Sequence, residues 1–224
     1  MKILALGDIH FPFQNNSALE WCVEVVRKEK PDLVIQVGDL YDFYAFSKYT
    51  RSPAKIKLST EAELRLGRFQ AESLWEQLHK AHKRASLAVI YGNHDIRPLL
   101  RAREKLPEAE IIMEDWLKKR MTFSGVDTLP NETVIEGVMF QHGFRKFGEH
   151  AVYNQMNTVC GHLHIGGTKM LTNRNGVFWE LNAGWLGDKT SEAFSYYEQK
   201  KIHPTTLGCG WIDSYGPRFM IYPG

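Results

Sequence analysis

The sequence is poor in cysteine, and its few cysteines lie far apart. They form no CxxC pair, and their number is odd. This pattern argues against a disulfide framework and favours reduced thiols, so we expect a cytoplasmic location. The three residues are Cys22, Cys160 and Cys209.

The sequence also lacks long apolar runs and a large excess of one charge. No uninterrupted apolar segment approaches the roughly 20 residues that a membrane-spanning helix requires, so no membrane partner is expected. The formal net charge of +2 is too small to indicate nucleic-acid binding by itself. With 224 residues, 43% of them hydrophobic and 24% charged, the composition is that of a globular protein, and we expect one domain over 1–224.

The first half of the chain alternates predicted strands with predicted helices. Apolar and β-branched runs predict strands at 3–7, 33–37 and 87–91. Between them, apolar residues at helical spacing predict a helix over 18–30, which Pro31 ends, and a long helix over 59–84. Thr60 to Glu63 resembles a capping box at the start of the long helix. This order is typical of parallel strands joined by helical crossovers.

The second half is richer in strands, and turn residues divide it into hairpins. We expect hairpins at 134–141 around Glu136 and Gly137, and at 168–181 around Asn175 and Gly176. A third is expected at 211–222, turning at Tyr215, Gly216 and Pro217. An α/β half followed by a β-rich half implies a mixed sheet, or two stacked sheets, flanked by helices.

Metal-competent or acid-base residues follow every predicted core strand. Because ligands bind beyond the carboxyl ends of strands in helix-covered sheets, these clusters can converge at one rim. Within two of them the side chains are two positions apart, which places both on one face of an extended backbone. The clusters are Asp8 with His10, Asp39, Asn93 with His94 and Asp95, His142, and His162 with His164.

These five blocks, in this order, resemble the calcineurin-like metallophosphoesterase family, whose pattern is D-x-H, GD, GNH[DE], H and GHxH. Any one block alone is a weak signal, whereas the ordered set is specific. The resemblance implies an α/β (α+β) fold with four layers, a sandwich of two stacked mixed β-sheets flanked by α-helices. It covers most of the chain, from Asp8 to His164.

The same resemblance implies a dinuclear metal centre with Asp39 as the bridge. Imidazole and oxygen ligands together suit transition metals, so we expect two divalent ions, with manganese first and iron, zinc or nickel as alternatives. Two divalent ions with only two carboxylates leave the site positive, and this charge attracts a phosphate ester. The ions also activate a water molecule for attack. The implied ligands are Asp8, His10, Asp39 and His164 for one ion, and Asp39, Asn93, His142 and His162 for the other.

His94 is the expected catalytic side chain beside the metals. An imidazole suits protonation of the leaving oxygen, and the family histidine of GNH takes this part. Asp42 matches an acidic position that hydrogen-bonds this histidine in some relatives; capping a loop is the alternative. Phosphoprotein phosphatases of the family place arginine after that aspartate, but Phe43 stands here. This departure argues against phosphoprotein substrates.

Aromatic and basic residues are interleaved directly after Asp39, and we expect a substrate-binding loop at 41–58. Such a composition suits nucleotides or single-stranded nucleic acid, although packing of the aromatics is an equal alternative. Three further substrate contacts are predicted at Arg97, Tyr44 and Trp185, the last either a stacking surface or a core anchor. The loop residues are Tyr41, Phe43, Tyr44, Phe46, Lys48, Tyr49, Arg51, Lys55 and Lys57.

The sequence therefore predicts a metal-dependent hydrolase of phosphate esters, first of all a phosphodiesterase that acts on nucleotides or nucleic acid. The enzymatic alternatives are a phosphomonoesterase and a nucleoside polyphosphate hydrolase. A metal-binding scaffold without catalysis is the alternative from another class, against which the intact His94 argues. No oligomeric state follows from the sequence.

Overall fold

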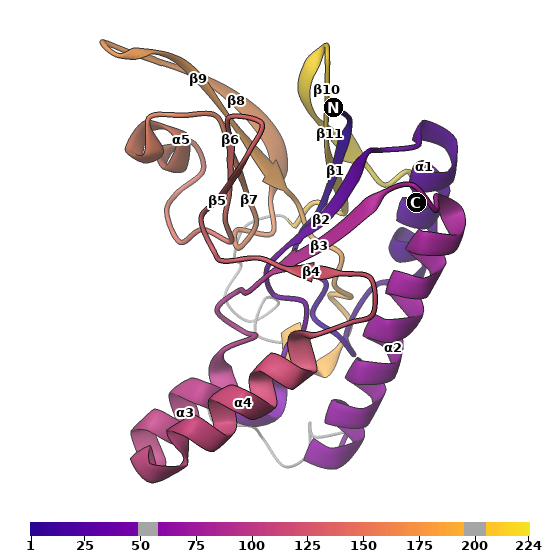
Figure 1. Cartoon of the computed structure of the whole chain (residues 1–224), viewed down its shortest axis with the longest axis vertical. Coiled ribbons are helices and arrows are strands. Elements are labelled where there is room, and N and C mark those ends of the chain that lie inside the picture. The colour runs from indigo at the N-terminus through magenta and orange to yellow at the C-terminus, as the bar shows by residue number, and fades with distance from the viewer. Residues whose placement is uncertain (49–57, 195–204) are drawn as a thin grey trace.

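Three parallel strands from the first half of the chain form the centre of the fold. The computed structural model describes residues 1–48, 58–194 and 205–224. In it, β1 (Ile3–Leu6), β2 (Leu33–Val37) and β3 (Ser86–Ile90) lie side by side, with β2 between the other two (Figure 1). Nearly all of their residues are buried, as the continuous apolar runs predict for a sheet covered on both faces.

The first sheet extends this parallel core with strands from later in the chain. The short β4 (Asp127–Thr128) pairs with β3 in parallel. On the other side β10 (Gly208–Asp213) pairs with β1 in antiparallel fashion, and β11 (Gly216–Ile221) completes a hairpin with β10. Asp213 pairs with Gly216, so the hairpin turns at Ser214 and Tyr215, close to the predicted turn. The sheet is mixed, in the order β11, β10, β1, β2, β3, β4.

The second sheet is also mixed and comes from the β-rich half. Its order is β5, β6, β7, β9, β8, with two hairpins at the edges and parallel pairing in the middle. The hairpins turn at Glu136 with Gly137 and at Arg174 with Asn175, at or beside the predicted positions. The strands are β5 (Thr133–Ile135), β6 (Val138–Phe140), β7 (Thr158–Cys160), β8 (Gly166–Asn173) and β9 (Gly176–Ala183).

Apolar side chains between the two sheets form one core, and helices cover the outside. Alternate residues of the central strands, among them Ile35 and Leu181, meet between the sheets, while Val34 and the other residues on the opposite face of the first sheet pack against α1 (Asn16–Glu29) and α2 (Thr60–Ala81). The short α5 (Glu149–Asn154) contacts the second sheet. The predicted sandwich of two mixed sheets flanked by helices is confirmed (Figure 1).

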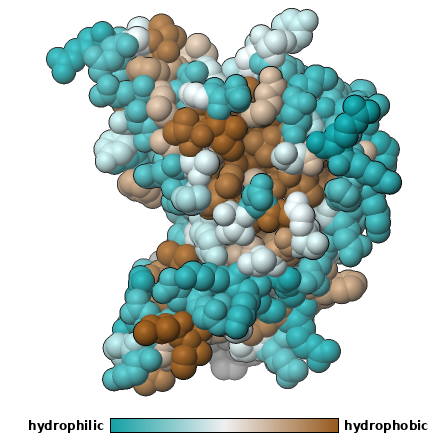
Figure 2. Space-filling model, in the orientation of Figure 1, coloured by the Kyte–Doolittle hydropathy of each residue, from teal (hydrophilic) through white to brown (hydrophobic). Residues whose placement is uncertain are grey.

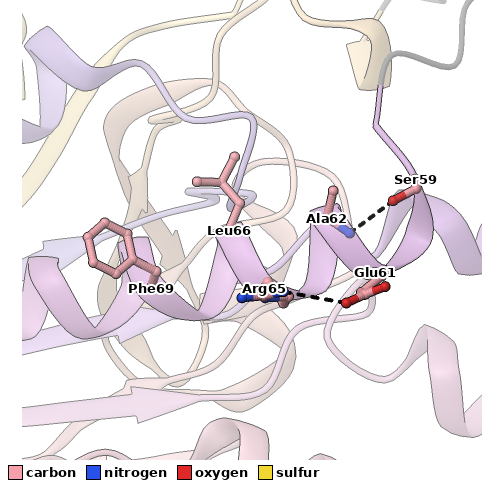
Figure 3. Close-up of a pocket in the computed structure, with 6 residues that line it drawn as sticks. All are labelled: Ser59, Glu61, Ala62, Arg65, Leu66 and Phe69. Atoms are coloured by element: carbon pink, nitrogen blue, oxygen red, sulfur yellow. Dashed lines mark hydrogen bonds and ion pairs between the residues drawn. The ribbon is translucent and has the colours of Figure 1, made fainter.

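The long helix α2 begins one residue earlier than the expected capping box. Ser59 is the N-cap, and its side chain accepts a hydrogen bond from the Ala62 amide at 3.1 Å (Figure 3). The Glu63 carboxylate does not close a box, since it accepts from the Ala45 amide at 2.9 Å.

An open hollow of about 560 Å³ lies along the first turns of this helix, and none of the predicted site residues lines it. Its lining residues are Ser59, Glu61, Ala62, Arg65, Leu66 and Phe69.

Two helices that the sequence pattern does not reveal project from the body of the fold. They are α3 (Arg97–Lys105) and α4 (Glu110–Met121), and several of their large apolar residues, such as Ile111 and Ile112, are exposed (Figure 1). Figure 2 shows apolar side chains on the surface at this end of the molecule. No helix within the described ranges has the length and apolarity to cross a membrane. The described residues also form three short 3-10 helices: η1 (Tyr44–Phe46), η3 (Pro107–Ala109) and η4 (Glu192–Phe194).

The three cysteines are buried free thiols, as the sequence predicts. A hydrogen bond with Cys209, together with burial, raises the pKa of the Cys22 thiol well above its usual value. A thiol with a raised pKa holds little thiolate and is correspondingly unreactive.

The Phe219 ring joins the edges of the two sheets by filling a space that three glycines leave open. A Cβ atom built on Gly166 would lie 2.0 Å from this ring, on Gly184 2.5 Å, and on Gly208 2.7 Å. Gly166 follows His164 by two residues, so this contact lies next to one predicted ligand. Close packing of one aromatic ring against three backbones leaves no room for side chains at these positions.

We predict that Gly166→Ala lowers the free energy of unfolding by about 1–3 kcal/mol, the usual cost of overpacking. The control is Gly67→Ala in α2, where the added Cβ would meet neighbours at ordinary contact distances of 3.4 Å or more. That change should raise stability by about 0.5–1 kcal/mol because alanine favours helix. Urea unfolding of the metal-free proteins gives both values, and equal midpoints for the two variants would contradict the prediction.

Candidate metal centre

All seven predicted ligands meet where strands of the two sheets end. Asp8 and His10 follow β1, Asp39 follows β2, and Asn93 follows β3. The second sheet adds the residues that follow two of its three parallel strands. These are His142 after β6, and His162 with His164 after β7. The rim that the sequence predicts therefore lies across the seam between the sheets.

One cluster of potential ligands contains Asp8, His10 and His164, all buried. The Nε2 atoms of His10 and His164 are 3.1 Å apart, and Oδ1 of Asp8 lies 3.4 Å from His164 Nε2. The Asp8 carboxylate is oriented by the backbone amide of His162, which donates to it at 2.8 and 3.0 Å. Three donor atoms therefore face one point.

A second cluster contains Asp39, His142 and His162, with Asn93 beside them. The Asn93 Oδ1 atom lies 2.9 Å from His142 Nε2 and 2.8 Å from His162 Nδ1. The Asp39 Oδ2 atom lies 3.2 Å from His142 Nε2. The resemblance assigns His10 and His164 to one metal and His142 and His162 to the other. Each pair lies in the cluster expected for it.

Asp39 faces both clusters with a single oxygen. Its Oδ2 atom is 3.2 Å from His142 Nε2 and 3.9 Å from His10 Nε2. Its other oxygen, Oδ1, accepts a hydrogen bond from the His94 backbone amide at 2.7 Å. That amide fixes the rotation of the carboxylate and leaves Oδ2 between the two clusters, which is the geometry of a bridging ligand.

At several of the predicted ligands the backbone adopts the left-handed conformation, which most residues avoid. Non-glycine residues rarely adopt a positive φ, and such residues are typical of functional sites. The glycines fit equally tightly: a Cβ on Gly92 would lie 2.2 Å from Asp39 Oδ1, and one on Gly161 would lie 2.6 Å from Asp8 Oδ2. Five predicted ligands have φ between 44° and 70°: Asp8, His10, Asp39, His162 and His164.

The hydrogen bonds of the histidines show that the donor set fits metal ions. His10 donates from Nδ1 to Asp42 Oδ2 at 3.0 Å, and His142 donates from Nδ1 to the Val37 carbonyl at 3.0 Å. When neutral, each ring then has a lone pair on Nε2, which faces the carboxylate of Asp39. Acceptors that converge in a buried site require a cation between them. Mixed nitrogen and oxygen donors suit a divalent transition metal.

The pKa shifts agree with this requirement for positive charge. Burial lowers the pKa of His142, but the Asp39 carboxylate outweighs it and raises that pKa to about 10. A proton on His142 therefore supplies the charge when no metal does. Burial, with His94 nearby, lowers the pKa of His10 to about 4, so this ligand stays neutral near pH 7. Metal binding at the second cluster must displace a proton.

Asp42 is held in place by three side chains and orients two of them. Its Oδ2 atom accepts from Nδ1 of His10 at 3.0 Å and from Nδ1 of His94 at 3.1 Å, and its Oδ1 accepts from Arg97 at 3.0 Å. Burial alone would raise the pKa of Asp42, but His94, His10 and Arg97 hold it well below its usual range. The predicted contact with His94 is present, and the contact with His10 is one that the sequence pattern did not reveal.

His94 and Arg97 lie together at the edge of the site. The His94 side chain is 12% exposed, and its Nε2 atom lies 3.9 Å from Asp39 Oδ2. Arg97 Nη2 donates to this Nε2 atom at 2.7 Å, while Nη1 donates to the Asp42 carboxylate. In this arrangement the lone pair of His94 Nε2 faces the guanidinium and its Nδ1–H faces Asp42. Arg97 lies beside His94 and Asp42, and its contact with substrate stays a prediction.

The aromatic residues expected to form a substrate-binding loop mostly belong to the core. Tyr41 and Phe43 are buried and stacked on each other, and Phe46 packs edge-on against Phe43. The packing alternative is therefore the one that the structure favours for these three. Tyr44 is partly buried against Phe13. The rest of the predicted loop, at 49–57, lies outside the described residues.

Trp185 packs against a ligand instead of facing the open side of the site. It is 1% exposed, and its ring stacks on His164 with centroids 5.2 Å apart and an angle of 7° between the planes. This geometry favours the core anchor over the stacking surface for substrate. Its contact helps to fix the ring of His164.

Two residues that no sequence motif marks for this role support the ligands: the buried Asp95 and the exposed Asn131. Asp95 accepts from the backbone amides of Leu40, Tyr41 and Gly92, and so ties the loop after β2 to the loop after β3. Its place in the Gly92 to Asp95 block was visible, but its role needs the tertiary structure. Asn131 likewise accepts from the amide of His142 at 2.9 Å.

We predict that Asp39→Asn reduces bound manganese from two ions per chain to none or one weakly held ion. Asp8→Asn should retain the ion of the Asp39, His142 and His162 cluster, because Asp8 belongs only to the other cluster. Elemental analysis after manganese loading and desalting measures both. Equal metal content in the two variants would contradict the bridging role of Asp39.

We further predict that Asp42→Asn weakens metal binding at the His10 cluster by about 10- to 100-fold, the usual effect of removing a group that orients a ligand. Competition with a coloured chelator measures the affinity. Asp115→Asn is the matched control, since Asp115 pairs with Lys119 on the exposed face of α4. Unchanged affinity in the Asp42 variant would show that His10 needs no such support.

Phage and cellular proteins resemble this chain. The gene 54 protein of Mycobacterium phage L5 is 25% identical over 207 residues, which cover 83% of this chain and 79% of the phage protein. The gene 54 protein of Mycobacterium phage D29 is 26% identical over 207 residues, which also cover 83% of this chain and 79% of the phage protein. Among solved structures, the Escherichia coli phosphoesterase YfcE is 14% identical with a TM-score of 0.49, covering 96% of this chain and 89% of its own.

The family model described as calcineurin-like phosphoesterase matches residues 1–174. This range contains all five sequence blocks and every ligand of the two clusters, from Asp8 to His164. The chain belongs to the calcineurin-like phosphoesterase family.

Proposed function

We propose that this protein is a phosphodiesterase that uses two divalent metal ions and acts on nucleotides or nucleic acid in the cytoplasm. The observation that carries the proposal is the pair of ligand clusters that share Asp39 Oδ2, with His94 held at their edge by Asp42. Manganese is the expected metal, and iron, zinc or nickel would suit the same donors. We also propose that residues 1–224 act as one domain.

The residues of the site support binding of an anionic ester. Two divalent ions held by such a set of ligands polarise a phosphate ester and activate a water molecule. Asp8 and Asp39 are the carboxylates among the seven ligands, so the loaded site is positive overall. Arg97 adds a guanidinium whose charge is partly offset by Asp42. A site with this excess of positive charge attracts an anionic phosphate ester.

His94 is the residue proposed to assist departure of the leaving group. Its Nδ1 atom is held by Asp42, and its Nε2 atom faces Asp39 and Arg97. When Arg97 turns from His94 to a phosphate oxygen, Nε2 becomes free to take up a proton from solvent and deliver it to the leaving oxygen. Asp42 stabilises the positive charge that the ring then holds. Arg97 would in this way bind substrate and release His94 together.

We predict that His94→Ala keeps both metal ions and lowers turnover by about 10²- to 10⁴-fold, the scale of one general acid. The loss should be smaller for p-nitrophenyl esters than for alkyl or nucleoside esters, because p-nitrophenolate needs little protonation. Steady-state kinetics on paired substrates measures this difference. His79→Ala on α2 is the matched control, and loss of metal from the His94 variant would defeat the proposed role.

A direct comparison of two synthetic esters tests the reaction type. The manganese-loaded protein should hydrolyse bis-p-nitrophenyl phosphate faster than p-nitrophenyl phosphate. A preference for the monoester would replace the proposal with a phosphomonoesterase. Inactivity on both esters, with metal bound, would support a metal-binding scaffold.

A further inference from the structure

A basic and aromatic surface lies beside the metal centre, on the segment that follows His142. The Arg145 guanidinium lies over the ring of Tyr153, 3.7 Å from its centroid, and 4.8 Å from the centroid of Phe144. Phe144 is 67% exposed and Tyr153 is 65% exposed. We call these three residues the Arg145 surface. Exposed apolar side chains that gather in one patch, unlike single ones, mark interaction sites.

The backbone of this surface is fixed by a buried network. His150 Nε2 accepts hydrogen bonds from the amides of Phe144 at 3.1 Å and Arg145 at 2.9 Å. The same ring contacts Glu180 Oε1 through Nδ1 at 3.2 Å. His150 and Glu180 are fully buried, and Glu180 also accepts from the amides of Gly148, His150 and Ala151. The segment is thus held rigid before any ligand binds.

This network accounts for a group that resembles a third metal site. His150, Cys160 and Glu180 lie close enough to bind an ion. The polar atoms of His150 and Glu180 are already used, since they hold the backbone of α5 and of the Arg145 surface. Their role is to position this segment.

The charge of Arg145 is not offset in the way that other arginines near the site are. Arg97 donates to Asp42, and Arg101 donates to Glu104 and to the backbone of η1. Within the described residues, the guanidinium of Arg145 has ring contacts and no carboxylate partner. Stacking on rings orients a guanidinium and leaves its N–H groups able to bind a phosphate.

The backbone of Arg145 lies close to the metal centre. It follows the ligand His142 by three positions, so their Cα atoms are at most about 11 Å apart. Exposed aromatics beside a cation are the combination by which proteins bind single-stranded nucleic acid, with bases stacked on rings and the backbone contacted by arginine. A lone phosphate ester would use neither feature.

We infer that the Arg145 surface binds single-stranded nucleic acid, with Arg145 on a phosphate that does not react and Phe144 against a base. The inference rests on the proposed function and names its substrate class. It replaces Tyr41, Phe43 and Phe46, which pack in the core, with residues of the loop after β6 and of α5 as the source of nucleic-acid recognition.

The test compares Arg145→Ala with Arg174→Ala, which removes the same charge at the exposed β8–β9 turn. Binding of a fluorescein-labelled single-stranded DNA to the metal-free proteins is followed by anisotropy. Arg145→Ala should weaken binding about tenfold and lower the slope of log affinity against log salt by about one, as loss of one phosphate contact requires. Arg174→Ala should bind as the wild type does.

Two further measurements distinguish recognition of a nucleic-acid strand from a general defect at the metal centre. Phe144→Ala should weaken DNA binding without changing the salt slope, because stacking releases no counterions. Arg145→Ala should hydrolyse bis-p-nitrophenyl phosphate at the wild-type rate, because this diester has one phosphate. Two results would overturn the inference. One is equal DNA binding by Arg145→Ala and Arg174→Ala. The other is a loss of activity on bis-p-nitrophenyl phosphate in Arg145→Ala that equals its loss of DNA affinity.

The remaining outcomes are also decisive. If Arg145→Ala weakens binding of a nucleoside triphosphate but not of DNA, the nucleic-acid assignment is wrong. If the loaded wild type fails to hydrolyse the synthetic diester, the proposed function fails, while the binding comparison of the arginine variants still decides the role of Arg145.

Discussion

The Asp39 carboxylate is the group around which the site is organised. One of its oxygens is held by the His94 amide, so the other must face the two ligand clusters. This geometry depends on features that are not ligands. Gly92 leaves room for the carboxylate, and Asp95 ties the loops after β2 and β3 together. Two negative groups buried this close to several imidazoles form a stable arrangement only with positive charge between them.

The site lies on the seam between the two sheets, so packing of the sheets sets the distances between ligands. The first sheet contributes Asp8, His10, Asp39 and Asn93, and the second contributes the other three ligands. The apolar core between the sheets fixes them against each other. The Phe219 ring, packed against three glycines, joins them at one edge. A change in that packing alters the metal site without touching a ligand.

The sequence could predict those features that depend on local spacing. The strands, the hairpin turns and the ligand blocks each occupy a few consecutive residues, so a period or a motif reveals them. The sequence could not predict contacts between distant segments, such as Asp42 with His10 or His150 with the amide of Arg145. It also could not distinguish a buried aromatic from an exposed one, which is why Trp185 could be either a stacking surface or a core anchor. Helix α4 exposes Ile111 and Ile112 and so lacks the apolar stripe that would have revealed it.

The left-handed backbone at five of the ligands has a consequence for how such a protein evolves. Each aspartate or histidine there costs on the order of 1 kcal/mol relative to glycine, which adopts this conformation freely. The metal-free chain bears that cost without compensation. Selection for folding alone would therefore replace ligands with glycine or asparagine and yield a sturdier, inert descendant. In this chain aspartate or histidine stands at all five positions, so folding stability is given up there for side chains that can bind an ion.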